Sequence, residues 1–283
     1  MAEGPRLNKV IEKLMAGEVV VSSAPIPNGN VDEAQSYGDS DFDMVVFEME
    51  HHGFDFIALR SSLQALLSRR RIAANGLAPS VVPFTRIPPN ARETSQWIVK
   101  QALDIGVYGL VTPQLQTPEE ALSIVNAVRY PARRDSGLGG GERGYWPHVA
   151  ARYWGLSSPE YTKKADVWPL NPDGELLVIG IIESVAGVQN IERILDATTG
   201  IGAYWPGPGD MAADMGLIGQ TGHPEVEANV QLVLDACTQR GVPCVGVATS
   251  ADDAVRRVRQ GFKIIFTRLE RGIAAAIRGA HEI

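Results

Sequence analysis

The sequence predicts an α/β protein with a parallel sheet, in the form of a (β/α)8 (TIM) barrel that makes a single domain of residues 1–283. Short apolar runs alternate with amphipathic stretches of helix length along the whole chain, which is the pattern of repeated βα units. With 283 residues, 45% of them hydrophobic, the chain has the size and apolar content of one barrel. A doubly wound open sheet is the competing architecture, but it favours a glycine-rich turn after the first strand, and this chain has none there.

Eight apolar runs are predicted to be strands because they are short and rich in Val, Ile and Leu. In chain order they are residues 19–22, 44–47, 80–84, 109–112, 176–182, 203–205, 243–247 and 263–267. Amphipathic segments with apolar residues at helical spacing are predicted to be helices. They are residues 7–16, 32–37, 57–68, 91–105, 118–128, 188–195, 224–240, 251–260 and 269–280. The first of them precedes the first strand, so we expect the barrel to carry an N-terminal helix.

Residues 133–173 interrupt this alternation with a glycine-rich stretch that is followed by Trp146, Trp154 and Trp168. A phosphate loop is excluded because no Gly-Lys-Ser/Thr follows the glycines. A long loop inside a compact domain is usually a lid or a binding loop, and tryptophans need a surface to pack against. We therefore expect a long loop between the fourth and fifth strands that covers the active-site face and shapes the substrate site.

The composition argues against several classes of function. Net charge is -7 and the pI is about 5.3, and the only basic run is at residues 69–71, so a nucleic-acid partner is not expected. The 2 cysteines make neither a disulfide framework nor a zinc motif. No apolar stretch is long enough to span a membrane, and the N-terminus lacks the apolar core of a signal peptide. We expect a cytoplasmic protein that does not bind membranes.

Two carboxylates follow predicted strands and are the main candidates for chemistry. One apolar run ends directly in Glu183, and another leads through Gly207, Pro208 and Gly209 into Asp210. Because parallel strands end at the same edge of a barrel, the two acids should converge there and bind a hard divalent cation. The alternative is that both are ordinary helix caps or first-turn acids, which βα connections commonly carry.

Other polar residues follow strands at the same predicted edge. Glu48, Glu50 and His51 come after the second strand, and Arg86 comes after the third. Together with the two acids, this set suits a divalent cation, an anion clamp and a general base. A lysine Schiff base is the other common route to aldol chemistry.

The lysines do not fit that alternative route. Lys263 begins its strand and so lies at the wrong end, and Lys163 and Lys164 lie in the insertion and are expected to be solvated. The sequence therefore favours a metal over an imine.

Several motifs resemble those of the HpcH/HpaI aldolase family, the class II pyruvate-type aldolases. They are residues 46–51 (VFEMEH), 85–86 (TR), 182–184 (IES), 207–216 (GPGDMAADMG) and 223–226 (HPEV). The chain departs from the family pattern at Glu48, where the family commonly has Asp, and at Ile181, where close relatives have Gln. The resemblance runs from about residue 7 to the C-terminus and implies a (β/α)8 barrel that uses Mg²⁺, Mn²⁺ or Co²⁺.

The resemblance also implies a role for individual residues. Glu183 and Asp210 look like the metal ligands, and Arg86 looks like the residue that contacts the keto or enolate oxygen. His51 looks like the base, acting through water, and Asp104 like the acid that orients it. The implied substrate-binding residues are Glu48, Arg86, Gly207, Pro208 and Gly209.

The expected activity is therefore that of a metal-dependent carbon–carbon lyase. It would cleave a 4-hydroxy-2-oxo acid into an aldehyde and pyruvate or a related 2-oxo acid. Two alternatives remain open: a citrate-lyase-like enzyme acting on an acyl-CoA, and a catalytically silent barrel used as a binding module. The resemblance further implies a homo-oligomer, a trimer or hexamer, in which elements near the C-terminus, including the helix at residues 269–280, contact a neighbouring subunit.

Overall fold

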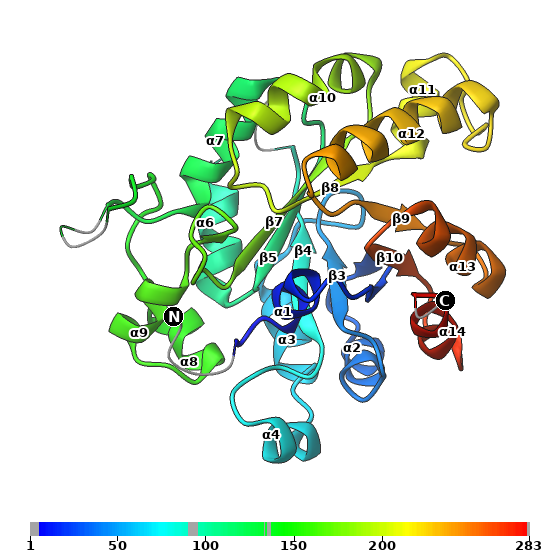
Figure 1. Ribbon diagram of the computed structural model, residues 1–283. Coiled ribbons are helices and arrows are strands. Elements are labelled where there is room, and N and C mark those ends of the chain that lie inside the picture. Colours follow the sequence, from blue (N-terminus) through cyan, green and yellow to red (C-terminus); the bar gives the residue numbers. More distant parts are fainter. Residues whose placement is uncertain (1–5, 90–95, 133, 135–136, 282–283) are drawn as a thin grey trace.

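The centre of the molecule is a curled sheet of parallel strands whose residues are almost all buried, as expected for strands covered by helices (Figure 1). The computed structural model describes residues 6–89, 96–132, 134 and 137–281. The strands of its 10-stranded sheet are β1 (Val20–Ser23), β2 (Ile26–Pro27), β3 (Met44–Glu48), β4 (Val82–Arg86), β5 (Gly109–Thr112), β6 (Val167–Trp168), β7 (Leu176–Ile182), β8 (Ala203–Pro206), β9 (Val245–Val247) and β10 (Ile264–Thr267). All predicted strands are present with small shifts at their ends, and only the short β2 and β6 were not predicted.

The strand pairs are parallel throughout the sheet, so the predicted α/β class with a parallel sheet is confirmed. The order is β6-β7-β5-β4-β3-β1-β10-β9, with β2 paired to β3 and β8 paired to β7. A parallel bridge between Tyr204 and Cys244 also connects β8 to the residue before β9. Parallel strands end on the same side, which we call the C-terminal edge, and begin at the opposite, N-terminal edge.

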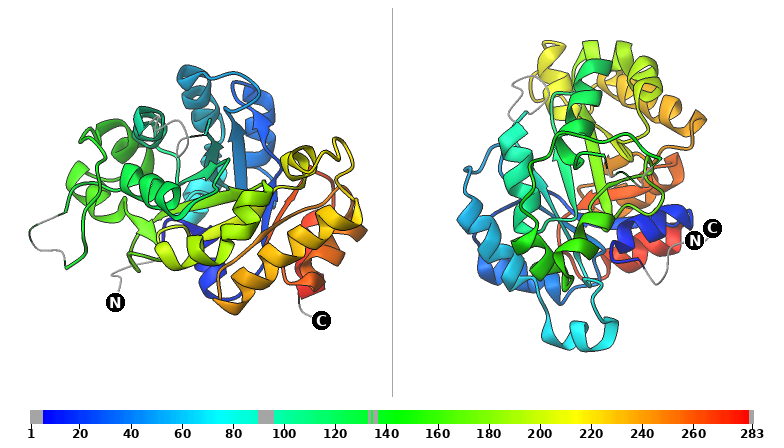
Figure 2. Two further views of the ribbon diagram at one scale, coloured as in Figure 1. Left: turned by 90° about the horizontal axis from the view of Figure 1, so that it is seen from above. Right: turned by 90° about the vertical axis from the view of Figure 1, so that its left-hand side faces the viewer.

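Helices lie on the outside of the sheet in all three views (Figure 1, Figure 2). They are α1 (Lys9–Met15), α2 (Val31–Gly38), α3 (Phe56–Ala65), α4 (Arg69–Asn75), α6 (Gln96–Ile105), α7 (Pro118–Val128), α8 (His148–Trp154), α9 (Ser158–Lys164), α10 (Val185–Ala197), α11 (Pro208–Asp214), α12 (Pro224–Gln239), α13 (Ala251–Gln260) and α14 (Ile273–His281). The predicted N-terminal helix is α1. The structure adds α4, α8, α9 and α11, which are short, and residues 91–95 of one predicted helix lie outside the described residues.

The last helix, α14, buries Ile273, Ala274 and Ile277 and packs against α13 of the same chain. Its apolar side is therefore covered without a neighbour, and the homo-oligomer stays a prediction. Among the helices of the described ranges, none combines the length and the apolar character needed to cross a membrane.

In the described part of the insertion, α8, α9 and β6 lie at the N-terminal edge, and coverage of the active-site face by this segment stays a prediction. Within it, the ring of Trp154 in α8 stacks on Tyr108, just before β5, at 4.0 Å between centroids. The Trp154 indole N–H also donates to the Gly106 carbonyl at 2.9 Å. The reason is topological: the segment follows a helix and precedes β7, and such αβ connections lie where strands begin. It also contains α8, α9 and β6 rather than being an irregular loop.

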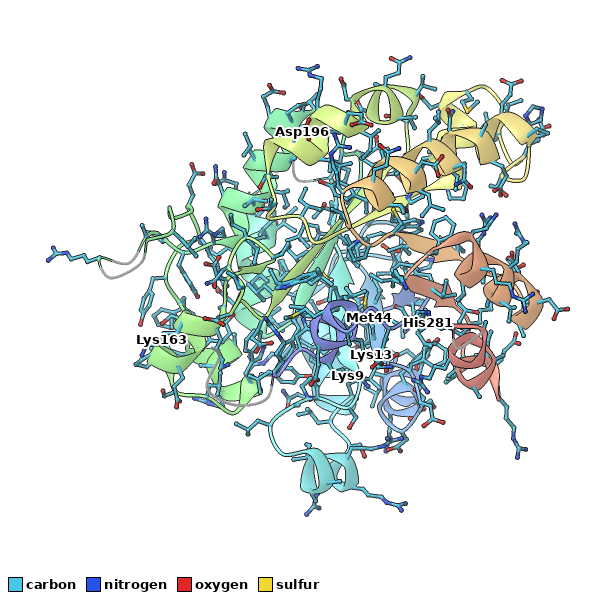
Figure 3. The ribbon with its side chains drawn as sticks, in the orientation of Figure 1. Lys9, Lys13, Met44, Lys163, Asp196 and His281 are labelled. Atoms are coloured by element: carbon cyan, nitrogen blue, oxygen red, sulfur yellow. The ribbon has the colours of Figure 1, made fainter. Side chains whose placement is uncertain are left out.

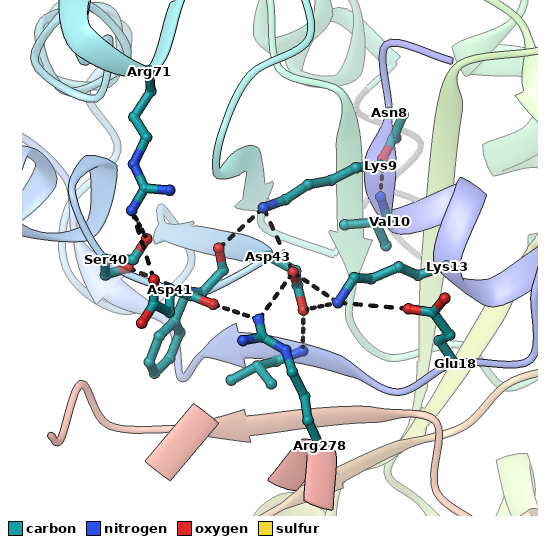
Figure 4. Close-up of polar contacts among 12 residues, drawn as sticks. Asn8, Lys9, Val10, Lys13, Glu18, Ser40, Asp41, Asp43, Arg71 and Arg278 are labelled. Carbon is teal, nitrogen blue, oxygen red and sulfur yellow. Dashed lines mark hydrogen bonds and ion pairs between the residues drawn. The ribbon is translucent and has the colours of Figure 1, made fainter. Parts of the chain in front are cut away.

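Asp43, just before β3, joins α1 and α14 to the N-terminal edge. The residue is 2% exposed, and its carboxylate lies 3.5 Å from the Lys9 ammonium, 3.1 Å from Lys13 and 3.3 Å from the Arg278 guanidinium (Figure 4). Lys9 and Lys13 thus contact the residue that directly precedes Met44, the first residue of β3 (Figure 3). Burial lowers the pKa of Lys9 to about 8, and Asp43 opposes this shift. The cluster therefore depends on a single buried negative charge.

We expect Asp43→Asn to lower the free energy of unfolding by about 3 kcal/mol, because removing one partner of a buried ion pair leaves the other charges uncompensated. Urea unfolding of the variant measures this. Asp41→Asn is the matched control, since the Asp41 side chain is 78% exposed. Equal unfolding free energies for the two variants would contradict the assignment.

Candidate active site

Glu183 lies at the C-terminal edge, directly after β7. The strand ends there because Ser184 is the N-cap of α10 and accepts a hydrogen bond from the Gly187 N–H at 3.1 Å. The Glu183 side chain is not the cap. Instead, its residue is 5% exposed, and its Oε1 accepts a hydrogen bond from the backbone N–H of Gln114 at 2.8 Å. The carboxylate is therefore free of the capping role that the alternative interpretation gave it.

Asp210 lies in the first turn of α11, which is tied to the end of β7 by two contacts. The Gly207 N–H donates to the Ile182 carbonyl at 2.9 Å. At the other end of α11, the Asp214 carboxylate accepts a hydrogen bond from the Val185 N–H at 2.8 Å. Asp210 is itself exposed. These contacts hold the Asp210 carboxylate beside the acid that follows β7.

Three carboxylates influence one another at this edge. Burial raises the pKa of Glu183 to about 8, and the nearby Asp210 and Glu50 add to the shift, with Asp210 close enough to share a hydrogen bond. Burial also raises the pKa of Glu50, with Asp210 again contributing. The predicted convergence of the two strand-end acids is thus observed, and Glu50 joins them from the loop after β3.

Glu48 and Arg86 form an ion pair between neighbouring strands, where the register of β3 and β4 places them opposite each other. Glu48 is 1% exposed, and its Oε2 accepts from the Arg86 Nε at 2.7 Å and also from Nη2. Its Oε1 accepts from the backbone N–H groups of Glu50 at 2.7 Å and His51 at 3.2 Å. Both oxygens are therefore engaged within the chain, and Glu48 holds Arg86 in place rather than facing open space.

Glu50 is the residue that links the basic and acidic groups of the site. Its Oε2 lies 3.3 Å from the Arg86 Nε and 3.2 Å from the Nε2 of the exposed His51. Sequence reasoning placed Glu50 at this edge but gave it no role. The signal was present in the Glu-x-Glu-His pattern, since residues two apart in extended backbone point to the same side, which puts both acids beside Arg86.

Trp205 of β8 was not predicted to belong to the site. Its ring centroid lies 5.7 Å from the Arg86 Cζ and 5.1 Å from the ring of Phe266. The residue is 8% exposed, and its indole N–H has no hydrogen-bond partner within the described part of the chain. The indole therefore borders the guanidinium and carries an unused donor.

The glycines and proline before Asp210 have different functions. A Cβ added to Gly207 would lie 3.1 Å from the Glu183 Oε2, whereas one added to Gly209 would meet open space. Pro208 occupies the first helical position of α11, where its missing N–H has no cost. Gly207 is thus the residue that lets the chain pass close to the Glu183 carboxylate.

Within the described part of the chain Asp104 pairs with Arg143 rather than with His51, and the pairing of Asp104 with His51 stays a prediction. Asp104 lies in the last turn of α6, before β5, and its carboxylate accepts from the Arg143 Nη2 at 2.8 Å. Burial raises the pKa of Asp104, and Arg143 opposes the shift. The residue belongs to the N-terminal edge because helices run back to that edge after each strand.

The donor set fits a hard divalent cation that completes its shell with substrate or water. Within the described ranges, no group of three or more His, Cys, Asp or Glu side chains is arranged to hold a metal on its own. Glu183 and Asp210 nevertheless bring two carboxylates together; burial is the main cause of the raised pKa of Glu183, and the negative charges of Asp210 and Glu50 add to it. Oxygen ligands in this number suit Mg²⁺, which keeps several positions for water and substrate.

Comparison with known proteins finds one family and several similar aldolases. A family model described as HpcH/HpaI aldolase/citrate lyase matches residues 26–267. A hydroxypyruvate/pyruvate aldolase from Chromohalobacter salexigens is 34% identical over 224 residues, which cover 79% of this chain and 77% of that protein. A 5-keto-4-deoxy-D-glucarate aldolase from Salmonella arizonae is 31% identical over 235 residues, covering 83% and 80%.

Comparison with solved structures points to the same family. The crystal structure of an HpcH/HpaI aldolase/citrate lyase family protein from Burkholderia cenocepacia matches with a TM-score of 0.75 at 26% sequence identity, covering 97% of each chain. The similarity therefore extends over nearly the whole molecule.

Proposed function

Because the chain belongs to the HpcH/HpaI aldolase/citrate lyase family, we propose that it is a divalent-metal-dependent carbon–carbon lyase. Its substrate would be a 4-hydroxy-2-oxo acid, cleaved to an aldehyde and pyruvate or a related 2-oxo acid. The observation that carries the proposal is the meeting of Glu183, Asp210 and Glu50 with Arg86 at one edge of the sheet. The named aldolases among the relatives act on substrates of this class, which adds support.

In this proposal Glu183 and Asp210 hold one Mg²⁺, Mn²⁺ or Co²⁺ ion, which when bound supplies Lewis-acid stabilisation of negative charge on the substrate. Gly207, Pro208 and Gly209 border the substrate beside Asp210. Arg86, held by Glu48 and Glu50, donates to the 2-oxo oxygen as negative charge develops there.

Proton transfer is assigned to His51, which Glu50 contacts through Nε2. Acting through a water molecule, His51 accepts the proton of the 4-hydroxyl group while the C3–C4 bond breaks and the aldehyde leaves. C3 then takes a proton from solvent, which completes the 2-oxo acid. Asp104 pairs with Arg143 within one chain, and its role in orienting His51 stays a prediction.

The placement of lysines supports a metal route over an imine route. Lys163 is exposed on α9 (Figure 3), Lys164 lies 3.6 Å from Glu175, and Lys263 donates to the Gly17 carbonyl at 2.9 Å. These positions are away from the C-terminal edge. A Schiff base would need a desolvated amine beside Arg86.

Two assays on chelator-treated protein test the proposal. One follows deuterium exchange into the methyl group of pyruvate, and the other follows cleavage of a panel of 4-hydroxy-2-oxo acids. We expect both activities to return on adding Mg²⁺, Mn²⁺ or Co²⁺ and to be absent without them. Turnover of acyl-CoA thioesters alone would favour the citrate-lyase-like alternative, and failure of all three reactions with every metal would favour a silent binding module.

The fold proposed to carry this activity is the closed (β/α)8 barrel. Support comes from the bridge between Tyr204 and Cys244, which brings β8 to β9, and from the pairing of β9 through β10 to β1. We also retain the predictions of a homo-oligomer and of a cytoplasmic location.

A further inference from the structure

Gln114 has an unusual backbone conformation at the proposed metal site. It follows β5 and Pro113, and its φ is 60°, the only positive φ at a non-glycine residue within the described ranges. A side chain in this region costs on the order of 1–2 kcal/mol relative to ordinary backbone. Such a residue persists only where its surroundings over-determine it, and these places concentrate at functional sites.

The conformation turns two successive N–H groups toward β7. The Gln114 N–H donates to the Glu183 Oε1 at 2.8 Å, and the Leu115 N–H donates to the Ile181 carbonyl at 3.1 Å. In extended backbone, successive N–H groups point to opposite sides. The positive φ of Gln114 therefore allows successive N–H groups to bind both the Ile181 carbonyl of β7 and the Glu183 carboxylate that follows the strand.

Packing of the next residue holds this conformation in place. Leu115 is 1% exposed, and a Cβ added to Gly180 of β7 would lie 2.8 Å from its Cδ2. A Cβ added to Gly187 of α10 would lie 2.9 Å from the Leu115 carbonyl oxygen. Leu115 thus fits between two glycines, and the backbone before it cannot relax without disturbing both elements.

The two oxygens of Glu183 are held from opposite sides as a result. Oε1 is bound by the Gln114 N–H, and Oε2 faces Gly207, at 3.1 Å from where its Cβ would lie. The stretch of chain that Oε2 faces leads into Asp210. The backbone bond at Oε1 therefore fixes which oxygen is presented to the second carboxylate.

We propose that Gln114 is a positioning residue for the metal site, and that its positive-φ backbone, rather than its amide side chain, aims the N–H that orients the Glu183 carboxylate. The expected consequence is tighter binding of a divalent cation, and in this respect the inference rests on the proposed function. It predicts that metal affinity follows the tolerance of residue 114 for positive φ. Glycine and asparagine tolerate that region, and β-branched residues do so least.

The test is calorimetric titration of Mn²⁺ into chelator-treated wild-type protein and four variants, Gln114→Gly, Gln114→Asn, Gln114→Ala and Gln114→Val. We expect Gly and Asn to bind within a few-fold of wild type, Ala to be weaker, and Val to be weaker by on the order of 10–100-fold, the value of one hydrogen bond to a charged group. Thermal unfolding of each variant checks that it is folded. If Gln114→Val does not fold, the comparison is made with Gln114→Ala instead. The inference is overturned if Gln114→Gly and Gln114→Val lose Mn²⁺ affinity equally, or if neither Gln114→Val nor Gln114→Ala loses any.

Gln116→Val is the matched control, because it makes the same change two residues later, where the backbone N–H donates to the Glu120 carboxylate instead. We expect its Mn²⁺ affinity to equal that of the wild type. Loss in this control equal to that in Gln114→Val would also overturn the inference.

A second measurement separates this inference from the proposed function. In metal-free protein, hydrogen exchange of the Gln114 amide should be slow in the wild type and at least about tenfold faster in Glu183→Ala, which removes the acceptor. If wild-type protein bound no divalent metal, the proposed function would fail, while this comparison would still decide the inference. Equal exchange rates in the two proteins would refute it.

Discussion

Glu183→Gln is expected to abolish metal-dependent turnover while leaving the protein folded. The substitution keeps the shape of the side chain and its ability to accept the Gln114 N–H, but it removes one of the two charges proposed to bind the cation. Stabilisation by a catalytic metal is worth several kcal/mol, so kcat should fall by roughly 10³-fold or more. Mn²⁺ affinity, measured by titration calorimetry, should be lost in parallel.

Stability distinguishes this effect from misfolding. Burial raises the pKa of Glu183 to about 8, so the ionised carboxylate is disfavoured in the metal-free protein, and a neutral amide should unfold at the same temperature or higher. Glu192→Gln in α10 is the matched control, since that side chain is 56% exposed, and it should retain wild-type turnover. Near-wild-type metal-dependent turnover in Glu183→Gln would exclude the assignment.

Loss of Arg86 is expected to have the second largest effect. Arg86→Ala removes the donor proposed to meet the 2-oxo oxygen, and deletion of one such donor costs on the order of 10²–10³-fold in kcat. Pyruvate deuterium exchange and aldol cleavage should fall together, because both pass through the same charge on that oxygen. His51→Ala should instead reduce cleavage more than exchange, since its role is the proton of the 4-hydroxyl group.

The buried partner of Arg86 calls for a second variant. Removing Arg86 alone leaves Glu48, which is 1% exposed, without its cation, so part of any loss reflects destabilisation. The double variant Arg86→Gln with Glu48→Gln removes both charges of the ion pair. It should fold, and it should lose as much pyruvate deuterium exchange as Arg86→Ala. Arg193→Ala, on the exposed side of α10, is the control. Pyruvate exchange near the wild-type rate in the double variant would remove Arg86 from the mechanism.

Much of the architecture was predictable because its signals are local. Short apolar runs located the strands, and β5 and β7 have the bounds that were predicted. Apolar spacing located the longer helices in the same way. The helices α4, α8, α9 and α11 were not predicted, because seven residues give only about two turns in which to show a helical period.

The structure places four of the predicted site residues at one edge of the sheet. Glu183, Asp210, Arg86 and His51 all lie at the C-terminal edge, since each follows a strand and parallel strands end together. The position of Asp104 could not be predicted in the same way, because it lies at the end of α6 rather than after a strand. The insertion was assigned to the site from its composition, whereas its place after α7 puts α8, α9 and β6 at the N-terminal edge.

The sequence by itself determined which residues become strands, which become long helices, and which acids stand where strands end. These properties follow from the spacing of apolar residues and the order of elements along the chain, which are local. Only the tertiary structure decided that Glu50 joins Arg86 to His51, that Trp205 borders the guanidinium, and that Gln114 takes a positive φ to reach Glu183. Apart from the contact between the adjacent Glu50 and His51, these contacts join residues far apart in the chain, and they exist because curling of the sheet brings the ends of different strands close to one another.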